Sequence, residues 1–483
     1  MYRALALLLF ASVACGETAQ PPAPNDGGVT PDVVAPIEAS TDAAPDVDAG
    51  VAERPIDAGF FGMHLNKYGT PLHFGSERVW DAGVSWYALQ TGPTTFDFTL
   101  LKSRVAEANK YGFDVLYTFG HTPPSITKNK NDSADPPTDV ADDGTGTDAY
   151  VKAFWTQFMA TMCTGASGQK TCDPIKYFEM WNEPNTDLFF TGTYAQLARM
   201  SADAATIIKQ ECPTCVVLSA DTSCGGDGYR TNGDAGKCDL YMAAYLDAWQ
   251  KLGHMPDAGA WHAYPSHTNV SPSPMPETNV STWDTCPANQ DKATCTCKAA
   301  FVPNAECRHS IVEQIGLMRS VFDAHGLAGK PMYATEGGFN KTEDLPDAQE
   351  EVAYLGRWYL LQAGAGVARV YYYAQDDWAP LVNPDLTLDP AGVAYNALYD
   401  WLVGGSIAAC TSSGSVWSCP VTTPDHKAAL AIWDASATCT TSACPTTPTS
   451  VDASFTTWRD LAGASHTIAN HRAPIGSQPI LIE

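Results

Sequence analysis

Short apolar segments alternate with longer amphipathic segments along most of the chain after residue 59. The short segments are rich in Val, Tyr, Phe and Leu, as buried strands are, and the longer ones carry apolar residues at helical spacing. The expected strands are 62–66, 76–81, 113–120, 176–183, 216–221, 258–264, 331–336 and 368–373. The expected helices are 100–111, 150–162, 194–210, 240–252, 310–325 and 349–363. This alternation predicts an α/β fold, a (β/α)8 TIM barrel formed by residues 56–400.

A doubly wound parallel sheet is the alternative fold. It is disfavoured because polar residues recur at the C-terminal ends of many strands, and because no Gly-rich nucleotide loop follows the first strand. Residues 269–309 are irregular and rich in Pro and Cys, and they follow the sixth strand. They form either a lid or subsite wall, or an insertion without function.

The pattern changes after residue 401. Short apolar segments there alternate with Ser, Thr, Gly and Pro, which predicts a small C-terminal all-β, sandwich-like domain at 401–483. No linker separates it from the preceding helix. A packing domain fused to the barrel is therefore favoured over a separate sugar-binding domain.

The N-terminus has the pattern of an export signal. A positive start and an apolar stretch lead to residues 12–16, Ser-Val-Ala-Cys-Gly, which resemble a bacterial lipobox. The resemblance implies a signal peptide at 1–14 and lipidation of Cys15. An ordinary signal peptide is the alternative. Residues 15–55, rich in Pro, Ala and Asp, are expected to form a disordered tether. The protein is thus expected to be an exported lipoprotein at the cell surface or outer membrane, or otherwise secreted.

The formal net charge of −26 argues against nucleic acid and anionic polymers as partners. It is compatible with a neutral polysaccharide or oligosaccharide. No internal stretch is long and apolar enough to span a bilayer, so membrane contact is expected only through the lipid anchor. A monomer is expected.

The chain has 15 Cys, and fourteen remain if Cys15 carries a lipid. An even number of Cys in an exported protein indicates disulfides. Close pairs are Cys163/Cys172, Cys212/Cys215, Cys224/Cys238, Cys410/Cys419 and Cys439/Cys444. Four more form a cluster, Cys286, Cys295, Cys297 and Cys307. Disulfides are favoured in this cluster, and a zinc site is the alternative.

Two of the expected strands end in carboxylates. Glu183 lies in the segment Trp-Asn-Glu-Pro-Asn at 181–185, and Glu336 precedes Gly337 and Gly338. Cleavage of a glycosidic bond needs such a pair, one to protonate the departing oxygen and one to attack or to activate water. Glu183 is the expected acid/base and Glu336 the expected nucleophile. Arg78 and Tyr264 are expected to donate to Glu336, and Asn182 to a sugar hydroxyl.

These strand ends, with Arg78 on the second strand and His-Ala-Tyr at 262–264, resemble clan A of the retaining glycoside hydrolases. The segments 61–64, 78–81 and 117–123 and the C-terminal β module are most similar to family 39 and its relatives. The resemblance implies a TIM barrel, catalysis by Glu183 and Glu336, and retention of configuration. Activities vary within family 39, so it implies no particular substrate.

Further candidates line the same strand ends. His121 and His262 are expected to contact the sugar or else to be structural, and His64 is more readily structural. Three such His could bind zinc, but two carboxylates already supply the chemistry, so no metal or cofactor is expected. Trp378 is expected to stack on a sugar, whereas Trp80 and Trp181 are expected in the core.

The leading hypothesis is a retaining glycoside hydrolase acting on a β-linked glycan. One alternative is a non-catalytic carbohydrate-binding lipoprotein on the same fold, which would need neither Glu at a strand end. The other is an inverting hydrolase, which the separation of the two carboxylates would distinguish.

Overall fold

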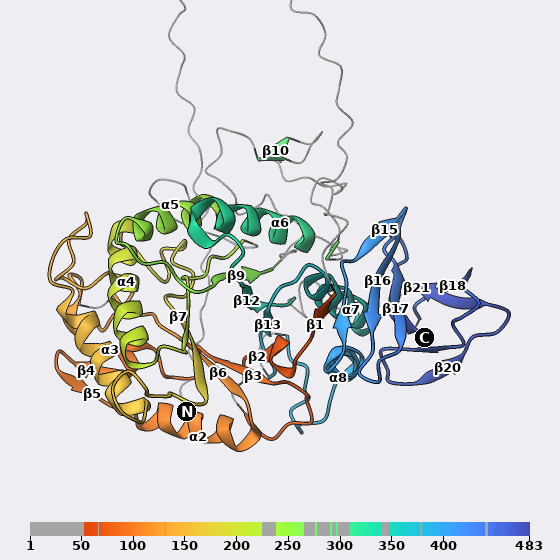
Figure 1. Cartoon of the computed structure of the whole chain (residues 1–483), viewed down its shortest axis with the longest axis horizontal. Coiled ribbons are helices and arrows are strands. Elements are labelled where there is room, and N and C mark those ends of the chain that lie inside the picture. The colour runs from red at the N-terminus through yellow and green to blue at the C-terminus, as the bar shows by residue number, and fades with distance from the viewer. Residues whose placement is uncertain are drawn as a thin grey trace, which may run out of the picture. The chain divides into compact units, whose positions relative to one another are not determined.

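The structure is a computed structural model of the chain. It describes residues 53–483 except 66, 131, 225–237, 265–275, 278–289, 292–295, 298–309, 340–344, 346, 377–378 and 440–442. Cys15, Trp378 and the side chains of Cys286, Cys295, Cys297 and Cys307 lie outside the described residues. Within them, a parallel barrel with surrounding helices is followed along the chain by antiparallel sheets (Figure 1).

Eight parallel strands form the barrel, in the order β8-β7-β6-β3-β2-β13-β12-β9. They are β2 (Phe61–Met63), β3 (Ser76–Val79), β6 (Asp114–Thr118), β7 (Ile175–Glu179), β8 (Val216–Leu218), β9 (Gly259–Ala263), β12 (Met332–Gly337) and β13 (Arg369–Tyr372). A bridge between Leu218 and Ala258 joins β8 to β9 and closes the ring. All C-terminal strand ends therefore lie at one rim. The predicted TIM barrel is confirmed.

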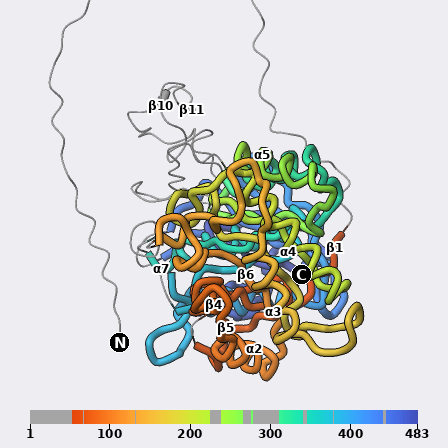
Figure 2. The backbone as a smooth tube through the Cα atoms, turned by 90° about the vertical axis from the view of Figure 1, so that its left-hand side faces the viewer, coloured from red at the N-terminus to blue at the C-terminus, as the bar shows by residue number. Residues whose placement is uncertain are grey.

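Helices surround the barrel and contact their chain neighbours in turn from α3 to α8. They are α1 (Trp86–Leu89), α2 (Thr99–Tyr111), α3 (Ala149–Met162), α4 (Tyr194–Glu211), α5 (Cys238–Gln250), α6 (Ile311–Phe322), α7 (Ala348–Gly364) and α8 (Pro390–Leu402). Thr193 and Ser310 start α4 and α6 with capping boxes, which satisfy free N–H groups of the first turn. In Figure 2 a hairpin of β4 (Gln90–Gly92) and β5 (Thr95–Phe96) lies beside α2 and α3.

Several strands end earlier than expected. β7 ends at Glu179 rather than at Glu183, because the chain then turns across the rim. Glu183 has a left-handed φ of 41°, and its N–H donates to Asp221 Oδ1 at 2.7 Å instead of to a strand neighbour. The expected strands 113–120 and 216–221 likewise stop at Thr118 and Leu218. The polar residues at these ends thus lie on the rim, just beyond the hydrogen-bonded ladder.

The C-terminal part is an all-β domain, as predicted. Its strands are β14 (Ser406–Ile407), β15 (Thr411–Ser413), β16 (Val416–Thr422), β17 (Ala428–Asp434), β18 (Thr446–Ser450), β19 (Thr457–Arg459), β20 (Ser465–Thr467), β21 (Arg472–Gly476) and β22 (Ile480–Ile482). The β18–β21 pair packs on the larger sheet through Ile432, Ile475 and Ile482. β1 (Arg54–Pro55) pairs antiparallel with β14, so one strand ahead of the barrel belongs to this sheet. The domain boundaries at 55/56 and 400/401 stay predictions.

A buried arginine joins the barrel to the β domain. Arg357 of α7 donates to Ser477 O and Oγ, both at 2.8 Å, and to Asp434 O at 3.1 Å. Its Nη1 also pairs with Glu277 Oε1 at 2.8 Å, and Trp433 Nε1 donates to the same oxygen at 3.0 Å. Glu277, in the segment after β9, is therefore bonded to both the barrel and the β domain.

Aromatic residues of the barrel strands are largely interior. Trp181 is fully buried and Trp80 is 6% exposed, as expected for core positions, and Tyr371 and Tyr372 are also fully buried. Tyr373 differs, since it is half-buried and its hydroxyl donates to Asp81 Oδ2 at 2.8 Å. No helix among the described residues is long and apolar enough to cross a membrane.

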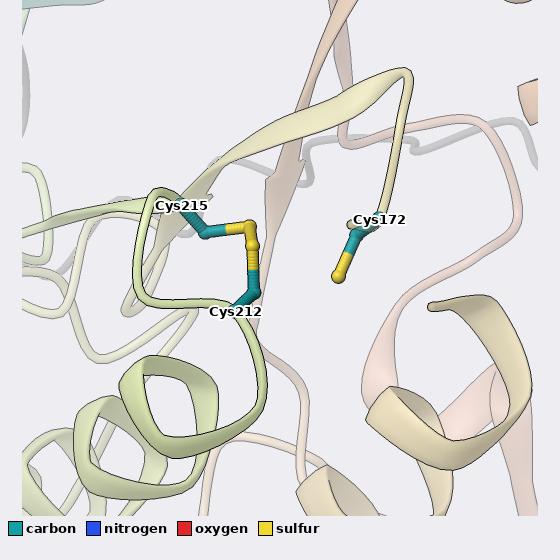
Figure 3. A group of neighbouring side chains, drawn as sticks. All are labelled: Cys172, Cys212 and Cys215. Carbon is teal, nitrogen blue, oxygen red and sulfur yellow. A yellow bond between two sulfur atoms is a disulfide. The ribbon is translucent and has the colours of Figure 1, made fainter. Parts of the chain in front are cut away.

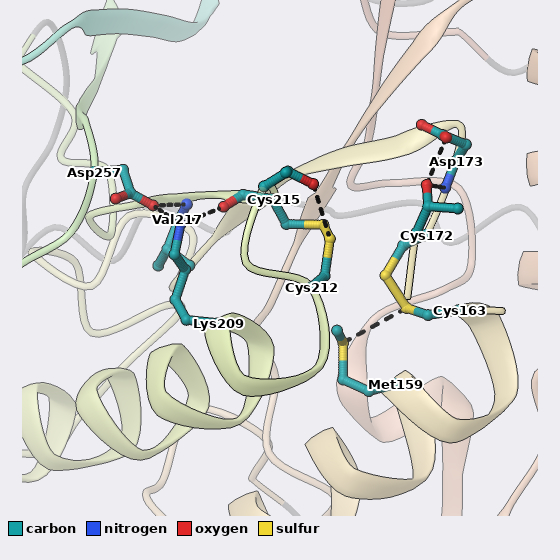
Figure 4. The surroundings of a disulfide bond; sticks show 11 residues. Met159, Cys163, Cys172, Asp173, Lys209, Cys212, Cys215, Val217 and Asp257 are labelled. Atoms are coloured by element: carbon teal, nitrogen blue, oxygen red, sulfur yellow. Dashed lines mark hydrogen bonds and ion pairs between the residues drawn. A yellow bond between two sulfur atoms is a disulfide. The ribbon is translucent and has the colours of Figure 1, made fainter. Parts of the chain in front are cut away.

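Within the described part of the chain, all five close Cys pairs are disulfide-bonded, as expected. Two of these disulfides, Cys163–Cys172 and Cys212–Cys215, lie close together just before β7 and β8. The sulfurs of Cys172, Cys212 and Cys215 lie within 4.8 Å of one another (Figure 3). Lys209 holds the adjacent turn by donating to Cys215 O and Asp257 Oδ2, at 2.8 and 3.0 Å (Figure 4). Because these sulfurs are bonded in pairs, they offer a metal no thiolate in this state.

Candidate active site

The two expected catalytic carboxylates meet at the C-terminal rim of the barrel. Glu336 belongs to β12 and is 9% exposed. Glu183 lies in the turn after β7, which is closed by Thr186 N donating to Glu183 O at 3.0 Å. One oxygen of each carboxylate and a ring nitrogen of His262 all lie within 4.8 Å of one another.

Arg78 of β3 is the centre of the polar network and is 1% exposed. Its Nη1 donates to Glu336 Oε2 at 2.8 Å, and its Nη2 to Asn182 Oδ1 at 2.8 Å and Asp221 Oδ2 at 3.0 Å. Its Nε donates to Glu179 Oε2 at 2.8 Å. Burial disfavours the cation, but these carboxylates outweigh it and raise the pKa of Arg78. The guanidinium therefore stays charged and fixes Glu336 and Asn182 in one orientation.

Glu336 accepts from a second donor, because Tyr264 Oη lies 2.7 Å from its Oε1. Both oxygens are thus held, one by Tyr264 and one by Arg78. Burial raises the pKa of Glu336, while His262, Arg78 and the Tyr264 hydrogen bond act against this rise. The donors are what allow a desolvated carboxylate to remain ionised.

His262 of β9 lies between the acids. Its Nδ1 is 2.7 Å from Glu183 Oε1, and its Nε2 is 3.1 Å from Asp221 Oδ1 and 3.6 Å from Glu336 Oε2. Burial alone would lower the pKa of His262, but the charges of Asp221, Glu336 and Glu183 raise it well above the ordinary value. A cationic His262 donates to Glu183 on one side and faces Asp221 on the other.

Asp221 and Glu179 are site residues that the sequence analysis missed. Asp221 is fully buried, and its Oδ1 also accepts from Glu183 N, so it ties the acid/base turn to Arg78 and His262. Glu179 accepts from Thr118 Oγ1 at 2.8 Å as well as from Arg78, and burial raises its pKa to about 7. Each is an acid within an expected barrel strand, but this alone does not distinguish a buried site residue from a solvated one.

Two expected histidines differ in their positions. His64 is 4% exposed, and its Nε2 lies 3.2 Å from Arg78 Nη1. Burial and the charge of Arg78 lower its pKa well below the ordinary value, so it is neutral and structural. His121 is bonded instead to Ser133, with Nδ1 3.2 Å from Oγ, and stacks on Trp80 at 5.1 Å. Among the described residues, His121 makes no hydrogen bond or ion pair with Glu183 or Glu336.

Glu183, His262 and Glu336 offer one ligand atom each to a metal ion at ligand-like separations. The surroundings do not suit a divalent cation, because Arg78 already pairs with Glu336 at 2.8 Å. Both nitrogens of His262 also face carboxylates, and as an imidazolium it has no free lone pair. The geometry fits acid/base and nucleophilic chemistry better than metal ligation.

Comparison with protein-family models finds no match, and comparison with curated proteins finds none. Three solved structures with the same fold are a family 39 glycoside hydrolase from the gut symbiont Bacteroides cellulosilyticus WH2, a monomeric beta-xylosidase from Caulobacter crescentus CB15 and a Paenibacillus polymyxa xyloglucanase from family 44.

The first has a TM-score of 0.59 at 15% identity and covers 89% of this chain and 82% of its own. The second has a TM-score of 0.53 at 15% identity and covers 89% of this chain and 96% of its own. The third has a TM-score of 0.55 at 12% identity and covers 89% of this chain and 97% of its own. The likeness spans both the barrel and the β domain. The chain therefore shares its fold with glycoside hydrolases of families 39 and 44.

Proposed function

We propose that this protein is a retaining glycoside hydrolase that cleaves a β-linked glycan, with Glu183 as acid/base and Glu336 as nucleophile. The observation that carries the proposal is the separation of at most 4.8 Å between one oxygen of Glu183 and one of Glu336. Retaining enzymes place their carboxyl groups about 5 Å apart, whereas inverting enzymes leave room for a water between them.

In the first step, Glu336 attacks the anomeric carbon and the bond to the leaving oxygen breaks. Glu183 gives its proton to that oxygen, so the departing sugar leaves as a neutral alcohol. Arg78 and Tyr264 orient the attacking carboxylate, with one donor at each oxygen. The product is an ester between Glu336 and the sugar, and Glu183 is now an anion.

In the second step, Glu183 takes a proton from water and the resulting hydroxide oxygen attacks the same carbon. The ester bond to Glu336 breaks, and its electron pair returns to the carboxylate. His262 supports this step, because its Nδ1 lies 2.7 Å from Glu183 Oε1 and donates to the anionic form.

A β-linked substrate is supported by the neighbours' own activities, since one is a beta-xylosidase and another a xyloglucanase. The net charge of −26 also disfavours an anionic polymer. The alternative of a non-catalytic carbohydrate-binding protein has less support, because binding alone needs no pair of carboxylates held this close.

Glu183→Gln tests the acid/base role. Hydrolysis of substrates with poor leaving groups should fall about 100- to 10,000-fold. Dinitrophenyl glycosides need little protonation, so they should give a burst of released phenol followed by slow turnover that azide accelerates. Glu77→Gln is the control, because Glu77 is a buried acid of β3 that is bonded to Tyr68 and not to the residues of the site. Equal losses on both substrate classes would contradict the assignment.

The stereochemistry tests the mechanism independently. Proton NMR of the first-formed sugar should show the β anomer. An initial α anomer would mean inversion and would overturn the nucleophilic role of Glu336. Substrate binding without turnover in the wild-type protein would support the non-catalytic alternative instead.

We also propose that the protein is exported and anchored through a lipid on Cys15. The five disulfides of the described residues support export, because such bonds persist in oxidising compartments. Cys15→Ser should move the protein from the membrane fraction to the soluble fraction and remove labelling by a fatty-acid analogue. Unchanged labelling would contradict the anchor.

A further inference from the structure

Aromatic side chains from three rim loops pack together beside the acid/base turn. His121 contacts Trp80 at 5.1 Å with nearly parallel rings, 14° apart, and Tyr87 and Phe189 at 5.7 Å each. Trp80 and Phe189 meet at 6.0 Å. We call these four residues, together with Leu188, which directly precedes Phe189 in the chain, the aromatic wall. Tyr87 is 47% exposed and Leu188 73%, which makes both unusually open for large apolar side chains.

The wall adjoins the side of the site that holds Glu183. A Cβ on Gly120 would lie 2.9 Å from the Trp80 ring and 3.7 Å from Asn182 N, so the ring and this backbone close on the same glycine. The turn after Glu183 leads directly to the wall: Phe189 N donates to Thr186 O at 3.2 Å, and Trp181 Nε1 to Phe189 O at 3.0 Å.

The wall is built as a fixed surface rather than as loose side chains. Tyr87 N donates to His121 O at 2.9 Å and Trp86 N to Gly120 O at 3.0 Å, so the loops after β3 and β6 are joined by their backbones. Burial lowers the pKa of His121, against the opposing charge of Asp81, so the stacked ring is neutral at neutral pH. An uncharged aromatic surface matches the C–H face of a sugar ring better than it matches an ion.

The position of the aromatic wall beside Glu183 indicates which part of a substrate would bind there. In glycoside cleavage the acid stands on the side of the departing oxygen, and the sugar attached to that oxygen extends away from the nucleophile. We propose that the aromatic wall is a leaving-group subsite, which binds the apolar face of the sugar on the departing side of the scissile bond, with Tyr87 and Leu188 as specificity-determining residues. This inference rests on the proposed function and deepens it, because it assigns an oligosaccharide or polysaccharide substrate over a glycoside with a small leaving group.

Two substrates with the same glycone test the wall. A β-glycosyl fluoride places only fluoride on the departing side, whereas the matching β-linked oligosaccharide fills the subsite. A panel of β-glucosyl, β-xylosyl and β-galactosyl fluorides first identifies the glycone. Tyr87→Ala and Leu188→Ser should each lower kcat/KM for the oligosaccharide by about 3- to 10-fold, the value of one such contact. The rate on the fluoride should stay within a factor of about 2.

The control variants are Tyr111→Ala and Leu240→Ser. Tyr111 on α2 is 40% exposed, close to the value for Tyr87, and Leu240 on α5 is also exposed, at 47%. They should change neither rate. A second measurement uses transfer: an added disaccharide acceptor should divert the glycosyl-enzyme from water in the wild type, and less so in Tyr87→Ala.

Unchanged oligosaccharide rates and unchanged transfer in both wall variants would overturn the inference. Equal losses on the fluoride and the oligosaccharide would also overturn it, since they would indicate general damage to the site. A wild-type protein inactive on every fluoride and every oligosaccharide would instead contradict the proposed function. The two failures are therefore distinguishable.

Discussion

Arg78 pairs one fixed positive charge with the buried carboxylates of Glu179, Asp221 and Glu336. Burial, reinforced by the charge of Asp221, raises the pKa of Glu179, whereas the charge of Arg78 opposes this rise. His262 supplies the remaining positive charge. The charged groups of the site thus influence one another's pKa values. A single substitution among them should therefore alter the pH dependence of the reaction as well as its rate.

Tyr264→Phe removes one hydroxyl from Glu336 Oε1. The hydrogen bond favours the carboxylate, so its loss should raise the pKa of Glu336 further. The nucleophile would then be protonated at a higher pH, and the acidic limb of the kcat/KM profile should move upward in pH. The rate at neutral pH should fall about 10-fold or more. Tyr117→Phe is the control, because its buried hydroxyl bonds Val84 O instead. An unmoved limb would contradict the role of Tyr264.

His262→Gln should change stability in a pH-dependent way. The pKa of His262 is raised above 6.5 in the folded protein, so protonation stabilises the fold fully below about pH 6.5 and less as pH rises through the folded value. The difference in free energy of unfolding between wild type and variant should therefore be largest at acidic pH and shrink at alkaline pH. Urea unfolding across this range measures it, and a difference that is constant with pH would show that His262 is neutral.

At the scale of elements, regular alternation made the barrel predictable, because each strand and helix has its own period. The turn that carries Glu183 was not predictable in detail. Residues 180–183 continue a strand-like pattern, yet the chain leaves the ladder because Asp221 accepts from Glu183 N across the rim. Asp221 and Glu179 were missed for the same reason, since only tertiary contacts with Arg78 distinguish a buried acid from a solvated one.

The aromatic wall was also only partly visible in the sequence. His121 was a candidate because it follows an expected strand. Tyr87 lies in the short helix α1 and Leu188 in a loop, and neither belongs to a periodic segment of the sequence. Trp80 was expected in the core, and it is buried, but its ring also supports His121. The sequence pattern locates the strands, but packing between the loops decides where the strands end and which side chains meet beyond them.

The ion pair between Arg357 of helix α7 and Glu277 can be tested by substitution. Arg357 is fully buried and pairs with Glu277, whose side chain is 3% exposed. Arg357→Met should lower the free energy of unfolding by about 3–5 kcal/mol, because Glu277 would remain as an unpaired buried charge. Arg357→Met with Glu277→Gln should recover part of the loss. Chemical denaturation measures both, and no recovery in the double variant would show that the bonds to Ser477 and Asp434 carry the effect.

At the scale of the whole molecule, the barrel and the β domain are connected twice along the chain. Residues 54–55 form β1 on the edge of the β-domain sheet, the barrel follows, and the chain returns to pair β14 with the same residues. Ile56 N also donates to Gly405 O at 2.9 Å and Gly404 N to Ile56 O at 2.8 Å. In topology, the barrel is inserted into the β domain rather than followed by it.

This double connection bears on how such a protein can be recombined. A single genetic crossover after α8 would replace the strands from β14 onward but keep the original β1. That strand would then have to pair with a β14 from another protein. Exchange of the β domain therefore requires two compatible crossovers, one before β1 and one before β14, and two such events together are much rarer than one. The barrel and its β domain should be inherited as a unit, and a chimera is best cut ahead of Arg54 rather than between α8 and β14.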